Sequence, residues 1–141
     1  MNLRTMTEAA YLRLSKDRDQ VLTKHRGYGI VSVQVNDLTF AIPLRSNLNH
    51  SNGLKTVLVG RQWNGLDYSK ALLVNDDDLN KESFKPRTDA EYEKIQSSKE
   101  KVIKDFGAYV DGYIEAAKKN ETNNHKFRFT TLQYFHDELG I

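Results

Sequence analysis

Residues 28–44 of the 141-residue chain read YGIVSVQVNDLTFAIPL, and this stretch decides the fold class. Its first run is rich in β-branched residues and its second run alternates apolar with small or polar side chains, and both patterns are typical of strands. Asn36 and Asp37 stand between the runs, and these residue types tolerate the positive φ angles of a tight turn. Pro43 ends the second strand or places it at a sheet edge. The stretch therefore predicts a β-hairpin.

Further strands are expected on both sides of this hairpin. A short strand near Leu3 precedes a helix over residues 7–15, and apolar runs at 56–59 and 71–74 follow the hairpin, separated by the turn signal Asn64-Gly65. Short strands so close together favour a small, strongly curved antiparallel sheet or barrel.

The second half of the chain changes its period. Apolar residues between 90 and 118 recur at steps of three and four, which predicts one long amphipathic helix capped by Thr88 or Asp89. A polar loop follows, then a short strand over 126–129 and a terminal helix that ends at Gly140. The whole pattern predicts an α+β fold in a single domain, residues 1–141.

The composition narrows the class of protein. The chain is 38% hydrophobic and 28% charged, has no cysteine, and contains no apolar run of membrane-spanning length. No secretory signal is readable at the N-terminus. These features predict a cytoplasmic protein without disulfides or thiolate sites.

The formal net charge of +2 hides an asymmetry. Residues 1–74 carry an excess of five positive charges, whereas residues 75–141 carry an excess of three negative ones. Four cations and one acid, Asp67, lie within the stretch 45–70, which indicates either a positive surface for a polyanion or an ordinary solvated face.

Common phosphate-loop, dinucleotide and metal-ligand motifs are absent from the sequence. The four histidines are scattered, and the acidic run 76–78 lacks the alternating ligands of a calcium loop. The sequence therefore predicts no metal and no cofactor.

Two polar segments remain as a candidate site, PLRSNLNH at 43–50 and GLDYSKA at 65–71. Metal-free RNA cleavage needs a base for the 2′-hydroxyl, donors or cations for the charged phosphorane, and an acid for the departing 5′-oxygen. His50 suits proton transfer, Arg45 and Lys70 suit charge stabilisation, and Ser46 or Ser69 suits hydrogen bonding to phosphate.

A purely structural interpretation of the same residues is also open. In it, Arg45 pairs with Asp67, Ser46 caps a turn, and His50 is an exposed loop residue.

Three motifs give the chain a resemblance to a known family. FAIPLRSNLNH, GLDYSKALLV and FTTLQYFHDELGI, in this order, resemble the endoribonuclease toxins of type III toxin-antitoxin systems, most closely the TenpN-like branch of the ToxN/AbiQ group. The resemblance spans most of the chain.

This resemblance implies an SH3-like β-barrel of the MazF/Kid type with added helices at both ends. It also implies metal-independent RNA cleavage that leaves a 2′,3′-cyclic phosphate and a 5′-hydroxyl. The implied partner is a small repeat-derived RNA antitoxin, usually a pseudoknot, which the toxin processes and binds in a closed toxin-RNA assembly. Bacterial growth inhibition and phage defence are the implied biology, with cellular and phage RNA as substrates.

The family pattern transfers only in part. Ser46 matches the serine of the ToxN Thr-Ser pair, but Arg45 replaces the threonine and Leu48 stands near the family's lysine position. The predicted catalytic residues are Ser46, Arg45, His50, Lys70 and Ser69. The predicted RNA-contacting residues are Lys24, His25, Arg26, Tyr28, Lys55, Arg61 and Tyr68, with no choice made among the first three.

Other functions and roles stay open at this level. The same basic loops suit a non-catalytic RNA-binding module, and a similar barrel suits a toxin that poisons a protein. His50 is the candidate general base, with a lysine of lowered pKa or a group of the RNA as the alternatives.

Overall fold

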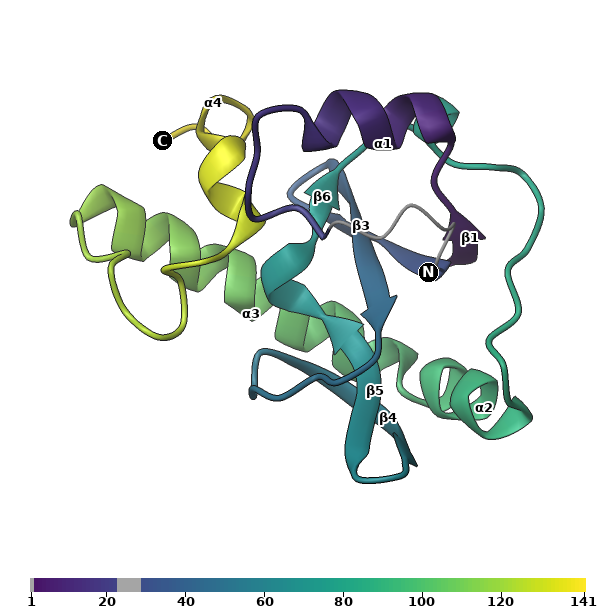
Figure 1. Ribbon diagram of the computed structural model, residues 1–141. Coiled ribbons are helices and arrows are strands. Elements are labelled where there is room, and N and C mark those ends of the chain that lie inside the picture. Colours follow the sequence, from purple (N-terminus) through teal and green to yellow (C-terminus); the bar gives the residue numbers. More distant parts are fainter. Residues whose placement is uncertain (1, 23–28) are drawn as a thin grey trace.

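The computed structural model describes residues 2–22 and 29–141, which form a mixed α+β fold around an antiparallel sheet (Figure 1). Lys24, His25, Arg26 and Tyr28 lie outside the described residues. The sheet has six strands, in the order β1-β2-β3-β5-β4, with β6 paired to β3. The strands are β1 (Asn2–Thr5), β2 (Gly29–Val35), β3 (Leu38–Arg45), β4 (Gly53–Val59), β5 (Gln62–Asp67) and β6 (Leu72–Leu73).

The predicted hairpin is confirmed as β2 and β3. Its two turn residues, Asn36 and Asp37, have φ angles of 52° and 64°, so both adopt the left-handed conformation that a two-residue turn requires. Val35 pairs with Leu38 beside the turn, and the ladder continues to the pair Ile30 and Pro43. The turn chemistry therefore sets the register of the central hairpin.

The second hairpin differs from the sequence prediction. β4 and β5 are joined at Gly60, which has a φ of 61°, whereas Asn64 and Gly65 lie inside β5. Gly65 belongs there because a Cβ atom would lie only 2.2 Å from the backbone oxygen of Leu54. The glycine marks a close approach of two strands rather than the predicted turn.

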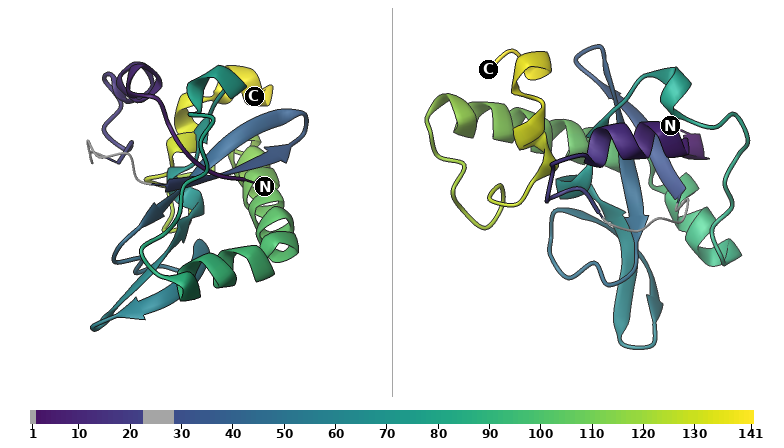
Figure 2. Two further views of the ribbon diagram at one scale, coloured as in Figure 1. Left: turned by 90° about the vertical axis from the view of Figure 1, so that its right-hand side faces the viewer. Right: turned by 45° about the horizontal axis from the view of Figure 1, so that its top comes forward.

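The expected closed barrel is not formed by the described residues. β3 joins two parts of the sheet, since β6 pairs with it at Phe40 and Ala41 whereas β5 pairs with it at Leu44 and Arg45. β5 and β6 share one edge of β3 because a 3₁₀ turn, η1 (Tyr68–Lys70), separates them. The β4–β5 hairpin projects from the rest of the sheet (Figure 2), so β1 and β4 remain as open edges.

The predicted long helix is two helices, α2 (Asp89–Ser97) and α3 (Lys99–Lys118). The break lies at the buried Ser98, whose φ of −101° and ψ of 9° are not helical. Thr88 is the N-cap of α2 and accepts a hydrogen bond from the backbone N–H of Glu91. The three- and four-residue period locates the buried faces but not the break between the helices.

The remaining helices flank the sheet at both ends of the chain. α1 (Glu8–Ser15) is capped by Thr7, as the N-terminal pattern indicates. The predicted strand over 126–129 is wrong, because Asn124 Oδ1 accepts hydrogen bonds from two successive N–H groups there and closes a turn. The predicted terminal helix is a 3₁₀ turn, η3 (Thr131–Tyr134), followed by the short α4 (His136–Leu139).

No helix among the described residues is both long and apolar enough to cross a membrane.

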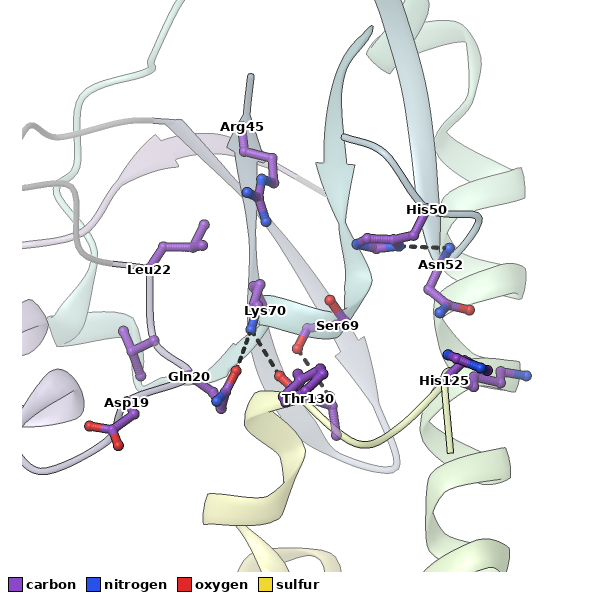
Figure 3. A pocket seen from close by; sticks show the side chains of 13 residues that line it. Asp19, Gln20, Leu22, Arg45, His50, Asn52, Ser69, Lys70, His125 and Thr130 are labelled. Atoms are coloured by element: carbon purple, nitrogen blue, oxygen red, sulfur yellow. Dashed lines mark hydrogen bonds between the residues drawn. The ribbon is translucent and has the colours of Figure 1, made fainter. Parts of the chain in front are cut away.

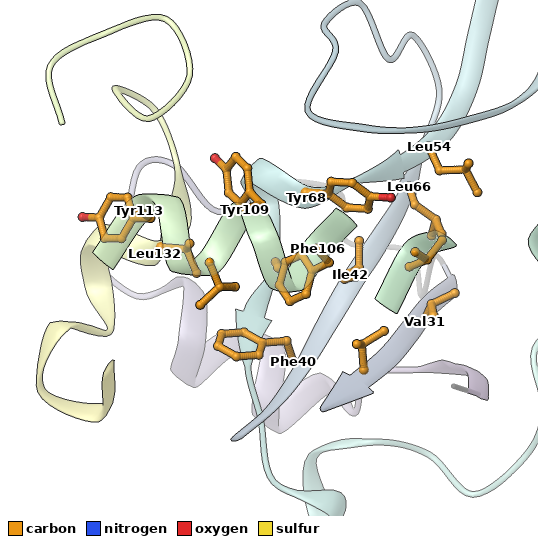
Figure 4. Close-up of a cluster of buried hydrophobic side chains, with 14 of the residues drawn as sticks. Val31, Phe40, Ile42, Leu54, Leu66, Tyr68, Phe106, Tyr109, Tyr113 and Leu132 are labelled. Carbon is orange, nitrogen blue, oxygen red and sulfur yellow. The ribbon is translucent and has the colours of Figure 1, made fainter. Parts of the chain in front are cut away.

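Both faces of the sheet are covered, by α3 on one side and α1 on the other (Figure 2). Phe106 of α3 is fully buried, with its ring centroid 5.3 Å from that of Phe40 and 5.7 Å from that of Tyr68 (Figure 4). A second buried cluster lies on the opposite face of the sheet. It contains Ile30 and Ala41, because successive side chains of a strand alternate between faces. The two clusters pack against β3 from both faces, and the first also contains Leu66 near the end of β5.

Candidate active site

The buried carboxylate of Asp67 organises the polar side chains at the end of β5. Asp67 Oδ2 lies 2.9 Å from Arg45 Nη1, and Oδ1 lies 3.2 Å from His50 Nε2. Oδ1 also accepts hydrogen bonds from the backbone N–H and the hydroxyl of Ser69, at 3.0 and 2.6 Å. One carboxylate thus fixes a guanidinium, an imidazole and a hydroxyl, three of the predicted site groups.

These contacts favour one tautomer of a neutral His50 ring. Its Nδ1 accepts a hydrogen bond from the backbone N–H of Asn52 at 3.1 Å, so the ring hydrogen lies on Nε2, which donates a hydrogen bond to Asp67. Both ring nitrogens are therefore engaged. This arrangement suits a positioned donor better than a free proton acceptor.

Ser69 lies in η1, two residues after Asp67. Its backbone oxygen accepts hydrogen bonds from the hydroxyls of Thr130 and Thr131, at 3.0 and 3.3 Å. The Thr131 hydroxyl also donates to the backbone oxygen of Ala71. The C-terminal segment thereby clamps the turn that carries Ser69 and Lys70.

Lys70 Nζ donates to Gln20 Oε1 at 3.0 Å and to the backbone oxygen of Phe129 at 2.8 Å (Figure 3). Burial lowers the pKa of Lys70; the negative charge of Asp67 opposes this shift and Arg45 adds to it. A lysine with a lowered pKa is a candidate for proton transfer at a functional site.

These groups face an open pocket of about 490 Å³, here called the Lys70 pocket (Figure 3). Segments far apart in the sequence line it, including Arg45, His50, Ser69 and Lys70. The remaining lining residues are Asp19, Gln20, Val21, Leu22, Asn52, His125, Lys126, Phe129 and Thr130. The structure therefore brings four of the five predicted catalytic residues to one cavity.

The fifth, Ser46, lies on the other side of Arg45. It lines a second pocket of about 390 Å³, whereas Arg45 lines both. Arg45 is the last residue of β3, so the end of this strand borders both cavities. Ser46 is adjacent to the Lys70 pocket without lining it.

Three of the predicted RNA-contacting residues lie elsewhere. Lys55 and Arg61 are exposed on the β4–β5 hairpin and line neither of these two pockets. The prediction for Tyr68 is wrong, because its ring is packed in the core between Phe106 and Tyr109. Burial, and secondarily the charge of Asp105, raises the pKa of its phenol.

Several parts of this site are not predicted from the sequence. The sequence indicates Asp67 only as an ion-pair partner, although it is the single acid among the cations of residues 45–70. Gln20 carries no local signal, and the motif FTTLQYFHDELGI includes Phe129 and Thr130 without indicating a contact with η1, because these residues reach it from distant segments. The described residues contain no cluster of three or more His, Asp or Glu side chains suited to holding a metal ion.

Comparisons with known proteins give the fold a precedent. No family model and no curated protein matches the sequence. One similar solved structure is ToxN, of a bacterial antiviral system regulated by a processed non-coding RNA; it has a TM-score of 0.63 at 11% identity, with 100% of both chains covered. Another is AbiQ, a lactococcal anti-phage endoribonuclease of a type III toxin-antitoxin system, with a TM-score of 0.66 at 16% identity over 99% of this chain and 95% of AbiQ.

These two structures define the class to which the fold corresponds, that of ToxN and AbiQ. The resemblance indicated by the three sequence motifs is thereby confirmed at the level of the fold.

Proposed function

We propose that this chain is an endoribonuclease toxin that cleaves RNA without a metal and is held inactive by a small RNA antitoxin. The observation that carries the proposal is the Asp67-centred group of Arg45, His50 and Ser69 beside Lys70 at an open pocket. Positive and hydrogen-bonding groups around one cavity suit a phosphodiester, whose charge rises in the transition state.

The proposed reaction is an internal transesterification of RNA. A base removes the proton of a 2′-hydroxyl, and that oxygen attacks the adjacent phosphorus. The bond from phosphorus to the 5′-oxygen then breaks, and an acid protonates the leaving oxygen. The products are a 2′,3′-cyclic phosphate and a 5′-hydroxyl, so atoms and protons balance without a co-reactant.

Arg45 is the proposed ligand of the charged phosphorane. Asp67 holds its Nη1, which leaves other N–H groups of the guanidinium available for phosphate oxygens. Ser46, which directly follows Arg45 and lines the second pocket, is the proposed hydrogen-bonding partner of the same phosphate.

Lys70 is the proposed general base, in preference to His50. A neutral amine has two hydrogens and one lone pair, and the two bonds from Lys70 Nζ to Gln20 and Phe129 occupy both hydrogens. The lone pair is then free to accept the 2′-hydroxyl proton. His50, with both ring nitrogens engaged, is the proposed positioning residue or proton donor.

The two similar structures support the biological part of the proposal. AbiQ is an anti-phage endoribonuclease of a type III system, and the other belongs to an antiviral system regulated by a processed RNA. We extend these properties to this chain, with a repeat-derived pseudoknot RNA as antitoxin and cellular or phage RNA as substrate, in the bacterial cytoplasm. We also propose that the curved strands correspond to an SH3-like arrangement and that the chain forms one domain.

Expression in bacteria tests this function. Wild-type protein without an antitoxin is expected to stop growth, whereas Ser46→Ala and Lys70→Ala are expected to restore it, because each removes a group proposed to act on the phosphate or the 2′-hydroxyl. Plating efficiency, with immunoblots for protein level, is the measurement. Full toxicity of both variants would contradict the site, and Lys104→Ala at an exposed position on α3 is the control.

The pH dependence of cleavage tests the role of Lys70. Because the neutral amine is the active form, kcat/KM is expected to rise with pH through the lowered pKa of Lys70. Lys70→Arg keeps the positive charge but does not deprotonate in this range, so it is expected to lose this rise and about 100-fold or more in rate. An unchanged pH profile in Lys70→Arg would refute the assignment, and Lys101→Arg on α3 is the matched control.

A further inference from the structure

The second pocket, of about 390 Å³ and here called the Glu91 pocket, lies across Arg45 from the Lys70 pocket. Its lining comes from the start of β2, the end of β3 with Ser46, from β4 and β5, and from the segment 84–88 and the first turn of α2. Its volume is in the range of ordinary small-molecule sites, about 300–1,000 Å³. An RNA strand whose phosphate contacts Arg45 would place a neighbouring nucleotide at its mouth.

The Glu91 side chain points into this pocket's wall instead of completing a capping box at the start of α2. Thr88 and Glu91 have the spacing of a capping box, in which the glutamate side chain ordinarily turns back to the N-cap N–H group. Here the Glu91 carboxylate is instead bonded to the hydroxyl of Thr56 on β4. Glu91 is only 7% exposed, so a buried carboxylate forms part of the pocket wall.

Flat and apolar groups form other parts of the wall. Phe84 packs so closely on Gly29 that a Cβ atom at position 29 would lie 2.2 Å from the Phe84 ring. Val57 and Val59 line the pocket from β4, and Asn64 lines it from β5. An aromatic ring, apolar side chains, an amide and a carboxylate are the groups that proteins use to hold a planar nucleobase.

The carboxylate decides which ligand fits. Arg45 and Arg87 also line the pocket and suit the phosphate of a bound nucleotide. At the carboxylate itself a phosphate is repelled, whereas a base edge with N–H donors gains hydrogen bonds to it. Guanine offers two adjacent donors, N1–H and N2–H, which match the two oxygens of a carboxylate.

We infer that the Glu91 pocket binds a guanine base of the RNA, next to the phosphate held by Arg45 and Ser46, and so determines the cleavage sequence. This inference deepens the proposed function and rests on it for the position of the phosphate.

Sequencing of cleavage ends from a random RNA pool tests the inference. Wild-type protein is expected to prefer guanine at one position beside the cut. Glu91→Gln, whose amide offers one donor and one acceptor, is expected to lower that preference about tenfold and to favour adenine, whose edge matches an amide. An identical cleavage profile in the two proteins, or no preference for guanine in the wild type, would overturn the inference.

Two control variants separate recognition from structure. Glu93→Gln removes an exposed charge from the same helix and is expected to leave the profile unchanged. Thr56→Val removes the hydroxyl bonded to Glu91 but keeps the carboxylate, so guanine is expected to remain preferred even if the rate falls. A loss of guanine preference in Glu93→Gln would also contradict the inference.

Binding of mononucleotides tests the pocket without catalysis. Titration of guanosine 3′-monophosphate is expected to shift the NMR signals of residues around Glu91, with at least tenfold weaker binding of the adenosine compound and a reversed order in Glu91→Gln. This result in a protein that cuts no RNA would refute the proposed nuclease but uphold the guanine pocket. Cleavage without guanosine selectivity would refute only the pocket.

Discussion

Asp67→Asn is expected to lower kcat/KM for RNA cleavage by about 100-fold or more. This is the largest loss expected from a substitution at a residue that is not proposed to contact the RNA. The amide keeps the shape of the carboxylate but carries no negative charge. It therefore cannot hold Arg45, His50 and Ser69 together as the carboxylate does. One carboxylate oxygen becomes an NH2 donor, so Arg45, bound at Oδ2, faces another donor and loses its fixed position, whereas the remaining amide oxygen still accepts from Ser69. Initial rates on an end-labelled RNA are the measurement.

The control for this variant must separate site geometry from stability. Loss of a charge from a partly buried ion pair also destabilises the fold, by about 2–3 kcal/mol once the 30% exposure of Arg45 is taken into account. Rates are therefore compared well below the unfolding transition, with circular dichroism on each protein. Asp111→Asn, at an exposed position on α3, should cleave normally, and cleavage by Asp67→Asn within a few-fold of wild type would disprove the organising role.

Phe106→Ala is expected to lower the free energy of unfolding by about 3–5 kcal/mol. Its ring is fully buried between α3 and the sheet, in edge contact with Phe40 and Tyr68, so its removal leaves a cavity in the main core. Urea denaturation followed by circular dichroism measures the change. Ile103→Ala on the same helix, at a side chain 41% exposed, should cost less than about 1.5 kcal/mol. A loss below 1 kcal/mol in Phe106→Ala would mean that the core packs differently.

Local chemistry explains which parts of the fold were predictable. The β2–β3 hairpin follows from two adjacent residues that accept positive φ, and Thr88 follows from a capping preference. Gly65 misled the prediction, since a glycine in a turn and a glycine at a close strand contact look alike in sequence. The bend at Ser98 was missed because both helices carry the same apolar period.

The site was predictable where its residues are near in sequence. Arg45, Ser69 and Lys70 lie in two short polar segments, and both segments reach the Lys70 pocket. Lys70 is separated by 50 residues from Gln20 and by 59 from Phe129, so only the folded chain reveals these partners. The same holds for the contact between Thr56 and Glu91, which the period of α2 does not indicate.

The position of Arg45 connects these features to one functional account. Arg45, at the end of β3, lines two pockets, one with the groups proposed for catalysis and one with a buried carboxylate. The acidic second half of the sequence contributes to both, through Lys126 and Thr130 on one side and Glu91 on the other. Net charge along the sequence is therefore a poor guide to the charge at the site.

The nature of the cleaved ends tests the central claim most directly. Purified protein is incubated in a metal chelator with a labelled RNA that contains one mapped cleavage site, and with the same RNA carrying a single 2′-deoxy nucleotide at that site. The account predicts a 2′,3′-cyclic phosphate and a 5′-hydroxyl from the first RNA and no cleavage of the second. Cleavage of the 2′-deoxy substrate, a 3′-hydroxyl product, or no cleavage of any RNA would contradict it.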